Sequence, residues 1–334
     1  MKKLVVLGIF IFSLSISAQE NNQFVPSGKP LFDVHWNYHL DLTEDADKTS
    51  AFELTRAYLG YSYSFTEAIS AKVTFDVGNN DAGTAYTAFL KVAQLDWKVA
   101  QGVKLSMGLI GLKQFKVQEK FWGYRYIFKS YQDQYGFGTS ADLGINAEFK
   151  LANNLTANLT IANGEGYKKI QDVNGKHKIA GNIIYKPVEG LTTKVYADYY
   201  KLDEDMDAIN AVALFAGYET SNWSLGAEYN MLNNATKYSS PAEDYELDGF
   251  SIYSTYELSN KVELFARFDQ LNSNTLSGDT EPSNEAKNGN QILAGVQVSP
   301  LKGLNFALNY RNFSFDDDAI NNKSLIYLNA QFKL

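Results

Sequence analysis

The segment Lys261–Asp269 alternates between apolar and polar side chains along its whole length. Successive side chains of an extended strand point to opposite faces, so Leu264 and Phe268 share one face. Arg267 and Asp269 share the opposite face. The same pattern recurs along the chain between turn-forming residues. A sheet with one apolar and one ionic face fits a closed barrel that meets lipid outside and water inside, because lipid leaves no partner for an open sheet edge.

Sixteen segments carry this strand pattern, and most are long enough for a tilted membrane strand, which needs about 9–11 residues. The predicted strands are 31–42, 51–64, 69–79, 86–100, 103–112, 137–150, 154–164, 177–187, 190–201, 209–220, 222–232, 247–258, 260–271, 290–300, 302–313 and 323–334. The fourth strand breaks the pattern, because Lys91 falls in phase with apolar side chains. We expect either a β-bulge or an early exit from the lumen at that residue.

The predicted connections alternate between short turns and long loops. Gln101-Gly102 and Ser259-Asn260 are short turns, whereas 113–136 is the longest loop and 272–289 is slightly shorter. Short turns on one rim and long loops on the other are typical of outer-membrane barrels. The predicted fold is therefore all-β: a transmembrane antiparallel up-and-down β-barrel of about 16 strands, with both termini at the short-turn, periplasmic rim.

The first residues have the features of a secretory signal peptide. Two lysines precede an apolar run from Leu4 to Ile16, which is too short to span a bilayer as a helix of about 20 residues. We expect a signal peptide at 1–18, a short periplasmic lead-in at 19–30 and one barrel domain at 31–334. Loss of the two lysines takes the net charge from −8 to −10 (−8 − 2), and an acidic chain argues against a nucleic-acid partner.

Two further segments carry a family resemblance. The final predicted strand alternates to the last residue and places Phe332 near its end, like the terminal strand of bacterial outer-membrane barrels. The segments Phe121–Tyr126 and Tyr135–Gly144 resemble porins of the Bacteroidetes, in particular the phosphate-selective porin O and P family. The resemblance implies passive diffusion of small hydrophilic solutes across the outer membrane, often through homotrimers, and a long third loop folded into the lumen. Outer-membrane lipid and lipopolysaccharide are the expected surroundings.

The longest loop is basic in an acidic protein, with five cations against two acids, or +3 (5 − 2). Its basic residues are Lys113, Lys116, Lys120, Arg125 and Lys129. Aromatic residues lie between them, so the rings could pack on the barrel wall while the cations face a constriction. A ring of basic side chains favours anions, which predicts an anion bias. The alternative is an outward loop whose rings join the interfacial girdle. Inward-facing strand positions add further constriction candidates: Arg56, Lys72, Arg267 and Arg311.

Other functions fit the chain less well. A barrel enzyme needs a catalytic set, and we identify no catalytic residues, metal ligands or cofactor motif. The absence of cysteine excludes disulfides and cysteine-ligated metals. A non-conducting adhesin barrel would be filled by side chains, which is typical of about eight strands. A soluble β-sandwich, in which the apolar faces pack on each other, is the remaining alternative.

Overall fold

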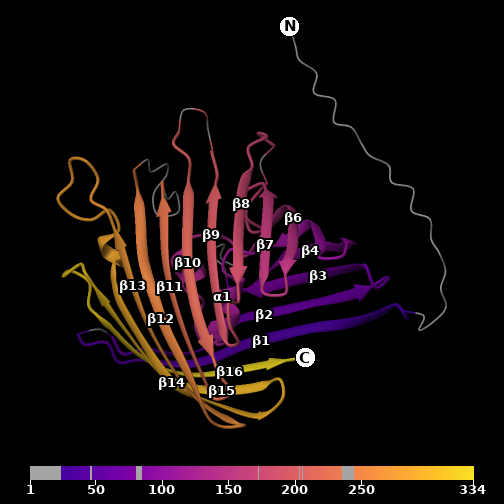
Figure 1. The fold of residues 1–334 in the computed structure, drawn as a ribbon. Helices are drawn as coiled ribbons and strands as arrows, with labels where there is room; N and C mark the ends of the chain where they lie inside the picture. Colours follow the sequence, from indigo (N-terminus) through magenta and orange to yellow (C-terminus); the bar gives the residue numbers. More distant parts are fainter. Residues whose placement is uncertain are drawn as a thin grey trace.

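The computed structural model describes residues 24–45, 47–79, 85–171, 173–202, 204, 206–234 and 244–334. The predicted signal peptide at 1–18 lies outside these residues. Sixteen antiparallel strands close into one barrel, in which each strand pairs with its neighbours in sequence (Figure 1). β1 closes the barrel on β16, in a register that runs from Asp33 opposite Lys333 to Asp41 opposite Leu325. The predicted sixteen-stranded up-and-down barrel is confirmed.

The strands follow one another from the first described segment to the end of the chain. They are β1 Ser27–Asp41, β2 Ser50–Ser64, β3 Ile69–Gly78, β4 Thr87–Ala100, β5 Val103–Gly111, β6 Ala141–Ala152, β7 Leu155–Ala162, β8 Lys178–Tyr185, β9 Leu191–Tyr199, β10 Asn210–Glu219, β11 Trp223–Asn233, β12 Glu246–Ser259, β13 Val262–Ser273, β14 Gly289–Leu301, β15 Leu304–Phe315 and β16 Lys323–Lys333. Short turns connect them on one rim and longer segments on the other.

The two faces of the sheet are inverted relative to a soluble protein. In β13, Leu264 on the outer face is 41% exposed, whereas Phe265 and Arg267 on the inner face are each 3% exposed. The other strands also carry large aliphatic and aromatic side chains on the outside. Their inner face carries polar side chains, together with buried apolar ones such as Tyr253 and Leu293. Soluble proteins keep their large apolar side chains inside, so this outer surface suits a hydrocarbon environment.

Two register shifts lie within the wall formed by the first four strands. Thr55 is the extra residue between β1 and β2, and Lys91 is the extra residue between β3 and β4. The bulge expected at Lys91 is confirmed. A bulge bends its strand and turns a side chain in a new direction, and bulges are frequent beside functional sites.

Two predicted strand ends were wrong by several residues. β1 begins at Ser27, because residues 27–30 pair with Tyr61–Ser64, and it therefore includes the end of the predicted lead-in. β6 begins at Ala141 and not at 137, because Phe137 packs in a buried apolar cluster with Tyr131.

The described parts of the loops contain three short helices: α1 Lys116–Trp122, α2 Tyr131–Tyr135 and the 3-10 helix η1 Glu285–Lys287. α1 ends at Gly123, whose positive φ of 78° allows its N–H to bond to the carbonyl of Glu119. Within the described ranges, no helix has the length and apolar character needed to cross a membrane.

Candidate functional site

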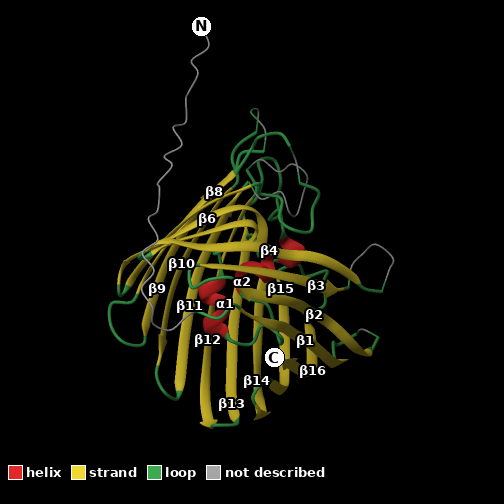
Figure 2. Ribbon diagram, turned by 90° about the vertical axis from the view of Figure 1, so that its right-hand side faces the viewer, coloured by secondary structure: helices red, strands yellow, loops and turns green. Residues whose placement is uncertain are grey.

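The third loop, residues 112–140, contains α1 and α2 (Figure 2). It packs against inward-facing side chains of the barrel. Trp122 and Tyr131 are fully buried. Trp122 lies in a cluster with Tyr253 and Phe265 from the wall, at ring-centroid distances of 5.5 and 6.2 Å. The aromatic residues interleaved in this loop therefore bind it to the inner face of the later strands.

Tyrosine hydroxyls add directional contacts between the loop and the wall. Tyr124 donates to the Glu263 carboxylate at 2.8 Å, and Tyr126 donates to the Gln297 side-chain oxygen at 2.7 Å. Tyr131 donates to the backbone carbonyl of Gln270 at 2.7 Å. Buried tyrosine hydroxyls need such partners, so these bonds help to fix the position of the loop relative to the wall.

Lys194 of β9 holds the start of the loop. Its ammonium donates to the carbonyl oxygens of Lys113 (2.9 Å) and Gln114 and to the side-chain oxygen of Gln118 (3.1 Å). The side chain is buried, and an ammonium has three donors, so the three acceptors satisfy it. This lysine serves to position the loop.

Arg267 of β13 and Arg311 of β15 donate hydrogen bonds to the backbone of the third loop. Arg267 forms a bidentate pair with Asp269, at 2.7 Å for both bonds, and donates to the carbonyl of Lys129 at 2.7 Å. Arg311 donates to the carbonyl of Ile127 at 2.9 Å, and its guanidinium stacks 3.6 Å from the ring centroid of Tyr327. Both arginines are buried, and neither lines the two cavities described next.

The larger cavity has a volume of about 810 Å³ and lies between α1 and the wall of the first strands. Seven cations and two acids line it, which gives a side-chain charge of +5 (7 − 2). The cations are Lys72, Lys91, Lys113, Lys116, Lys120, Arg125 and Lys333, and the acids are Asp33 and Glu119. This charge contrasts with the net charge of −8 for the whole chain.

A second cavity of about 640 Å³ lies on the other side of α1. Lys113, Lys116 and Lys120 border it as well as the larger one, and Lys186 is the fourth cation. Its acids are Glu148 and Glu219, so its side-chain charge is +2 (4 − 2). These three shared lysines therefore separate two cavities, each of which has a net positive lining.

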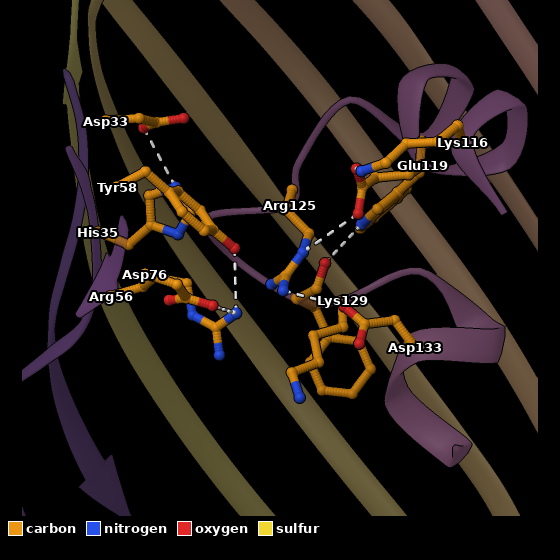
Figure 3. A network of polar contacts seen from close by, with 12 residues as sticks. Asp33, His35, Arg56, Tyr58, Asp76, Lys116, Glu119, Arg125, Lys129 and Asp133 are labelled. Carbon is orange, nitrogen blue, oxygen red and sulfur yellow. Dashed lines mark hydrogen bonds and ion pairs between the residues drawn. The ribbon is translucent and has the colours of Figure 1, made fainter. Parts of the chain in front are cut away.

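Arg125 occupies the centre of a polar network on the loop (Figure 3). Its guanidinium contacts Glu119 at 3.3 Å and Asp133 at 2.9 Å, and Lys116 contacts Glu119 at 2.7 Å. Burial opposes ionisation of Asp133, but Arg125 and Lys129 outweigh burial and lower the pKa of this carboxyl. Two acids contact the guanidinium of Arg125 and restrain its position, although its side chain is still 19% exposed.

A second network lies on the facing wall. Arg56 contacts Asp76 at 3.1 Å and Tyr58 at 3.0 Å, while Lys91 reaches the Tyr58 hydroxyl at 3.3 Å and Asp76 at 3.7 Å. The bulge turns Lys91 inward to this position. Lys91 was not among our predicted constriction residues, and the break in its strand pattern was the signal that could have identified it.

The nine predicted constriction residues thus occupy three kinds of position. Those lining the larger cavity are Lys72, Lys113, Lys116, Lys120 and Arg125. Arg56 lies in the network on the facing wall, next to Tyr58, which lines that cavity. Lys129, Arg267 and Arg311 belong to the contacts between the loop and the later strands. The described residues contain no group of three or more acidic or histidine side chains that could hold a metal ion.

No family model and no curated protein matches the chain. Solved structures do match over nearly its whole length. The outer membrane channel DcaP of Acinetobacter baumannii has a TM-score of 0.70 at 11% identity, covering 92% of this chain and 97% of that one. Salmonella typhi OmpF, in complex with daunomycin, has a TM-score of 0.70 at 13% identity, with 92% and 97% covered. The anion-selective porin from Comamonas acidovorans has a TM-score of 0.67 at 11% identity, with 93% and 100% covered. At these identities the chain is shown to share the fold of solved outer-membrane porins.

Proposed function

We propose that this protein is an outer-membrane porin: a water-filled channel for passive diffusion of small hydrophilic solutes, with a preference for anions such as phosphate. The observation that carries the proposal is the charge of +5 on the larger cavity inside a protein of net charge −8. The side chains that line this cavity therefore have a net charge opposite in sign to that of the whole chain. Basic side chains around a narrow aqueous path lower the barrier for anions and raise it for cations.

The third loop has a defined role in this proposal. Its aromatic side chains bind it to the later strands, and its lysines face the space that remains beside the first strands. Solutes would pass between α1 and the wall that carries Arg56 and Lys91. Solutes would then be selected by the width of the path and by the charges on its two sides, and their passage would need no chemical reaction.

The surroundings of the barrel follow from the same proposal. The apolar outer face would meet lipid and lipopolysaccharide in the outer membrane, and a homotrimer is the proposed assembly. One structural neighbour, OmpT of Vibrio cholerae, is described in a trimer form. Membership of the phosphate-selective porin O and P family of the Bacteroidetes remains part of this proposal.

The main alternative is a non-conducting barrel with an adhesive or structural role. One observation favours it: the third loop shares two buried apolar clusters with the wall, and such packing would fill part of the lumen. A conducting barrel needs a continuous aqueous path beside that loop. The two functions therefore differ in whether the barrel lets small solutes through.

Liposome swelling separates these functions. We expect vesicles that contain the protein to swell in an isotonic solution of a small sugar, at a rate that falls as the sugar becomes larger, because the path is sieved by width. Vesicles in a large dextran should not swell. Swelling no faster than in protein-free vesicles, with the barrel shown to be folded, would favour the non-conducting alternative.

A further inference from the structure

The fourth loop, between β7 and β8, turns back toward the barrel. The N–H of Gly164 donates to the Asp142 carboxylate at 2.6 Å, and the N–H of Tyr167 donates to the Ala141 carbonyl at 3.1 Å. Gly164 and Gly166 have positive φ angles of 115° and 85°, which side-chain-bearing residues rarely adopt. The backbone of this loop is thereby tied to the first residues of β6.

These ties bring Tyr167 to the wall that carries the second polar network. Its hydroxyl donates to Asp76 of β3 at 2.5 Å, on the same carboxylate oxygen that Arg56 contacts. Its ring lies 5.2 Å from the ammonium of Lys91 and 5.8 Å from that of Lys168. One aromatic ring therefore contacts two lysines and is itself fixed by a carboxylate.

Each lysine also lies near a second ring. Lys91 lies 4.7 Å from the ring centroid of Tyr58, and Lys168 lies 5.0 Å from that of Phe89. Ammonium groups are attracted to the faces of aromatic rings, and this attraction limits where a flexible lysine can go. Asp76 contacts Arg56, the Tyr167 hydroxyl and, at 3.7 Å, the ammonium of Lys91. One carboxylate therefore faces three cations (Arg56, Lys91 and Lys168), so the network keeps a net positive charge beside a passing anion.

The order of these groups along the barrel follows from the strands. β3 runs toward the loop rim and β4 runs away from it, so Asp76 and Phe89 lie nearer to the loops than Lys72 and Lys91 do. Lys168, which contacts Phe89, is therefore on the outer side of Lys91. A solute that comes from the loop rim reaches Lys168 first and the cavity lined by Lys72 later.

We propose that the fourth loop forms a second wall of the solute path, and that Tyr167 is the positioning residue that holds Lys91 and Lys168 beside passing anions. This inference rests on the proposed channel function and adds a specificity role for a loop that the sequence patterns did not single out. The ligand class is a small inorganic or organic anion in transit. Tyr167 acts through the two lysines and does not have to touch the solute.

The test compares Tyr167→Ala with Tyr167→Phe in planar bilayers under a potassium chloride gradient. We expect Tyr167→Ala to lower the chloride-to-potassium permeability ratio by at least about two-fold, because both lysines lose a ring that restrains them and loss of even one exposed cation–π contact changes an equilibrium by about that factor. Tyr167→Phe keeps the ring and should retain most of the ratio. Gln171→Ala is the matched control, because it removes contacts of the Gln171 side chain with Gly166 and Asn163 and leaves the ring and both lysines.

A double-mutant comparison separates positioning from general loosening. Lys168→Gln should lower the permeability ratio in the wild type and have a smaller effect when combined with Tyr167→Ala, because the lysine is already misplaced. Additive effects, or equal losses in Tyr167→Ala and Gln171→Ala, would overturn the role of Tyr167.

A thiol at position 168 provides a readout that does not depend on the tyrosine. The chain has no cysteine, so Lys168→Cys carries a unique thiol. An anionic methanethiosulfonate reagent should modify it and lower the chloride permeability; an unchanged current after complete modification would show that the loop is off the path. A wild type that forms no channel would remove the porin proposal and this one together, whereas a conducting wild type with an unchanged Tyr167→Ala variant would remove only this one.

Discussion

Replacement of Lys72, Lys116 and Lys120 by glutamate is expected to invert the ion preference of the channel. All three lysines line the larger cavity, and the substitutions change its side-chain charge from +5 to −1 (+5 − 6). Acidic side chains around a pore favour cations, as basic ones favour anions. In a tenfold potassium chloride gradient the reversal potential should change sign and move by tens of millivolts, within the limit of about 59 mV that a tenfold gradient sets for each sign.

A second triple variant controls for total charge. Lys48, Lys261 and Lys302 are exposed and line neither cavity, and their replacement by glutamate changes the charge of the protein by the same amount. This variant should keep the sign of the wild type. The difference between the two variants should narrow in 1 M salt, where the Debye length is about 3 Å, compared with about 10 Å at 0.1 M. Equal shifts of the reversal potential in both triple variants would mean that the cavity lysines affect ion selectivity no more than exposed lysines elsewhere on the protein.

Arg267→Met is expected to release part of the third loop and to destabilise the barrel. The substitution leaves the buried carboxylate of Asp269 without its cation and removes the donor to the Lys129 carbonyl. Breaking a buried ion pair by removing one partner costs about 3–5 kcal/mol. The expected results are a lower unfolding temperature in detergent, followed by circular dichroism, and a larger, noisier single-channel current.

The double variant Arg267→Met/Asp269→Leu separates the buried charge from the loop contact. Removing both charges avoids a buried carboxylate without its cation, so stability should recover most of the loss. The current should remain noisier than in the wild type, because the bond to the Lys129 carbonyl is still missing. If Arg267→Met alone were as stable and as quiet as the wild type, Arg267 would not anchor the loop.

The barrel could be predicted from the sequence because the alternation of side chains between the two faces of a strand depends only on residues that are adjacent in the chain. In β13 the alternation of Leu264 and Phe265 along the chain is the same alternation that places one outside and the other inside. The strand ends were less accurate where side chains have other partners. Phe137 continues an apolar pattern, yet it packs on Tyr131 within the loop and does not extend β6.

The roles of the basic residues could be predicted only in part. Composition identified the basic loop. No periodic pattern in the sequence distinguishes a cation that donates to a backbone carbonyl from one that lines a cavity. Arg311 and Ile127 are 184 residues apart in sequence, and their contact depends on the closed barrel. Lys194, which holds the start of the same loop, occupies an inward-facing position in the alternation of its strand. The sequence therefore does not separate it from a lysine that lines the lumen; its three oxygen acceptors in the structure do.

The proposed function requires that a hydrated path with a net positive lining runs through this barrel. Single-channel recording of the purified protein in a planar bilayer, with a tenfold potassium chloride gradient across it, tests this claim most directly. We expect discrete, ohmic current steps and a reversal potential displaced toward the equilibrium potential of chloride. The absence of steps from folded protein, or a displacement toward the equilibrium potential of potassium, would contradict it.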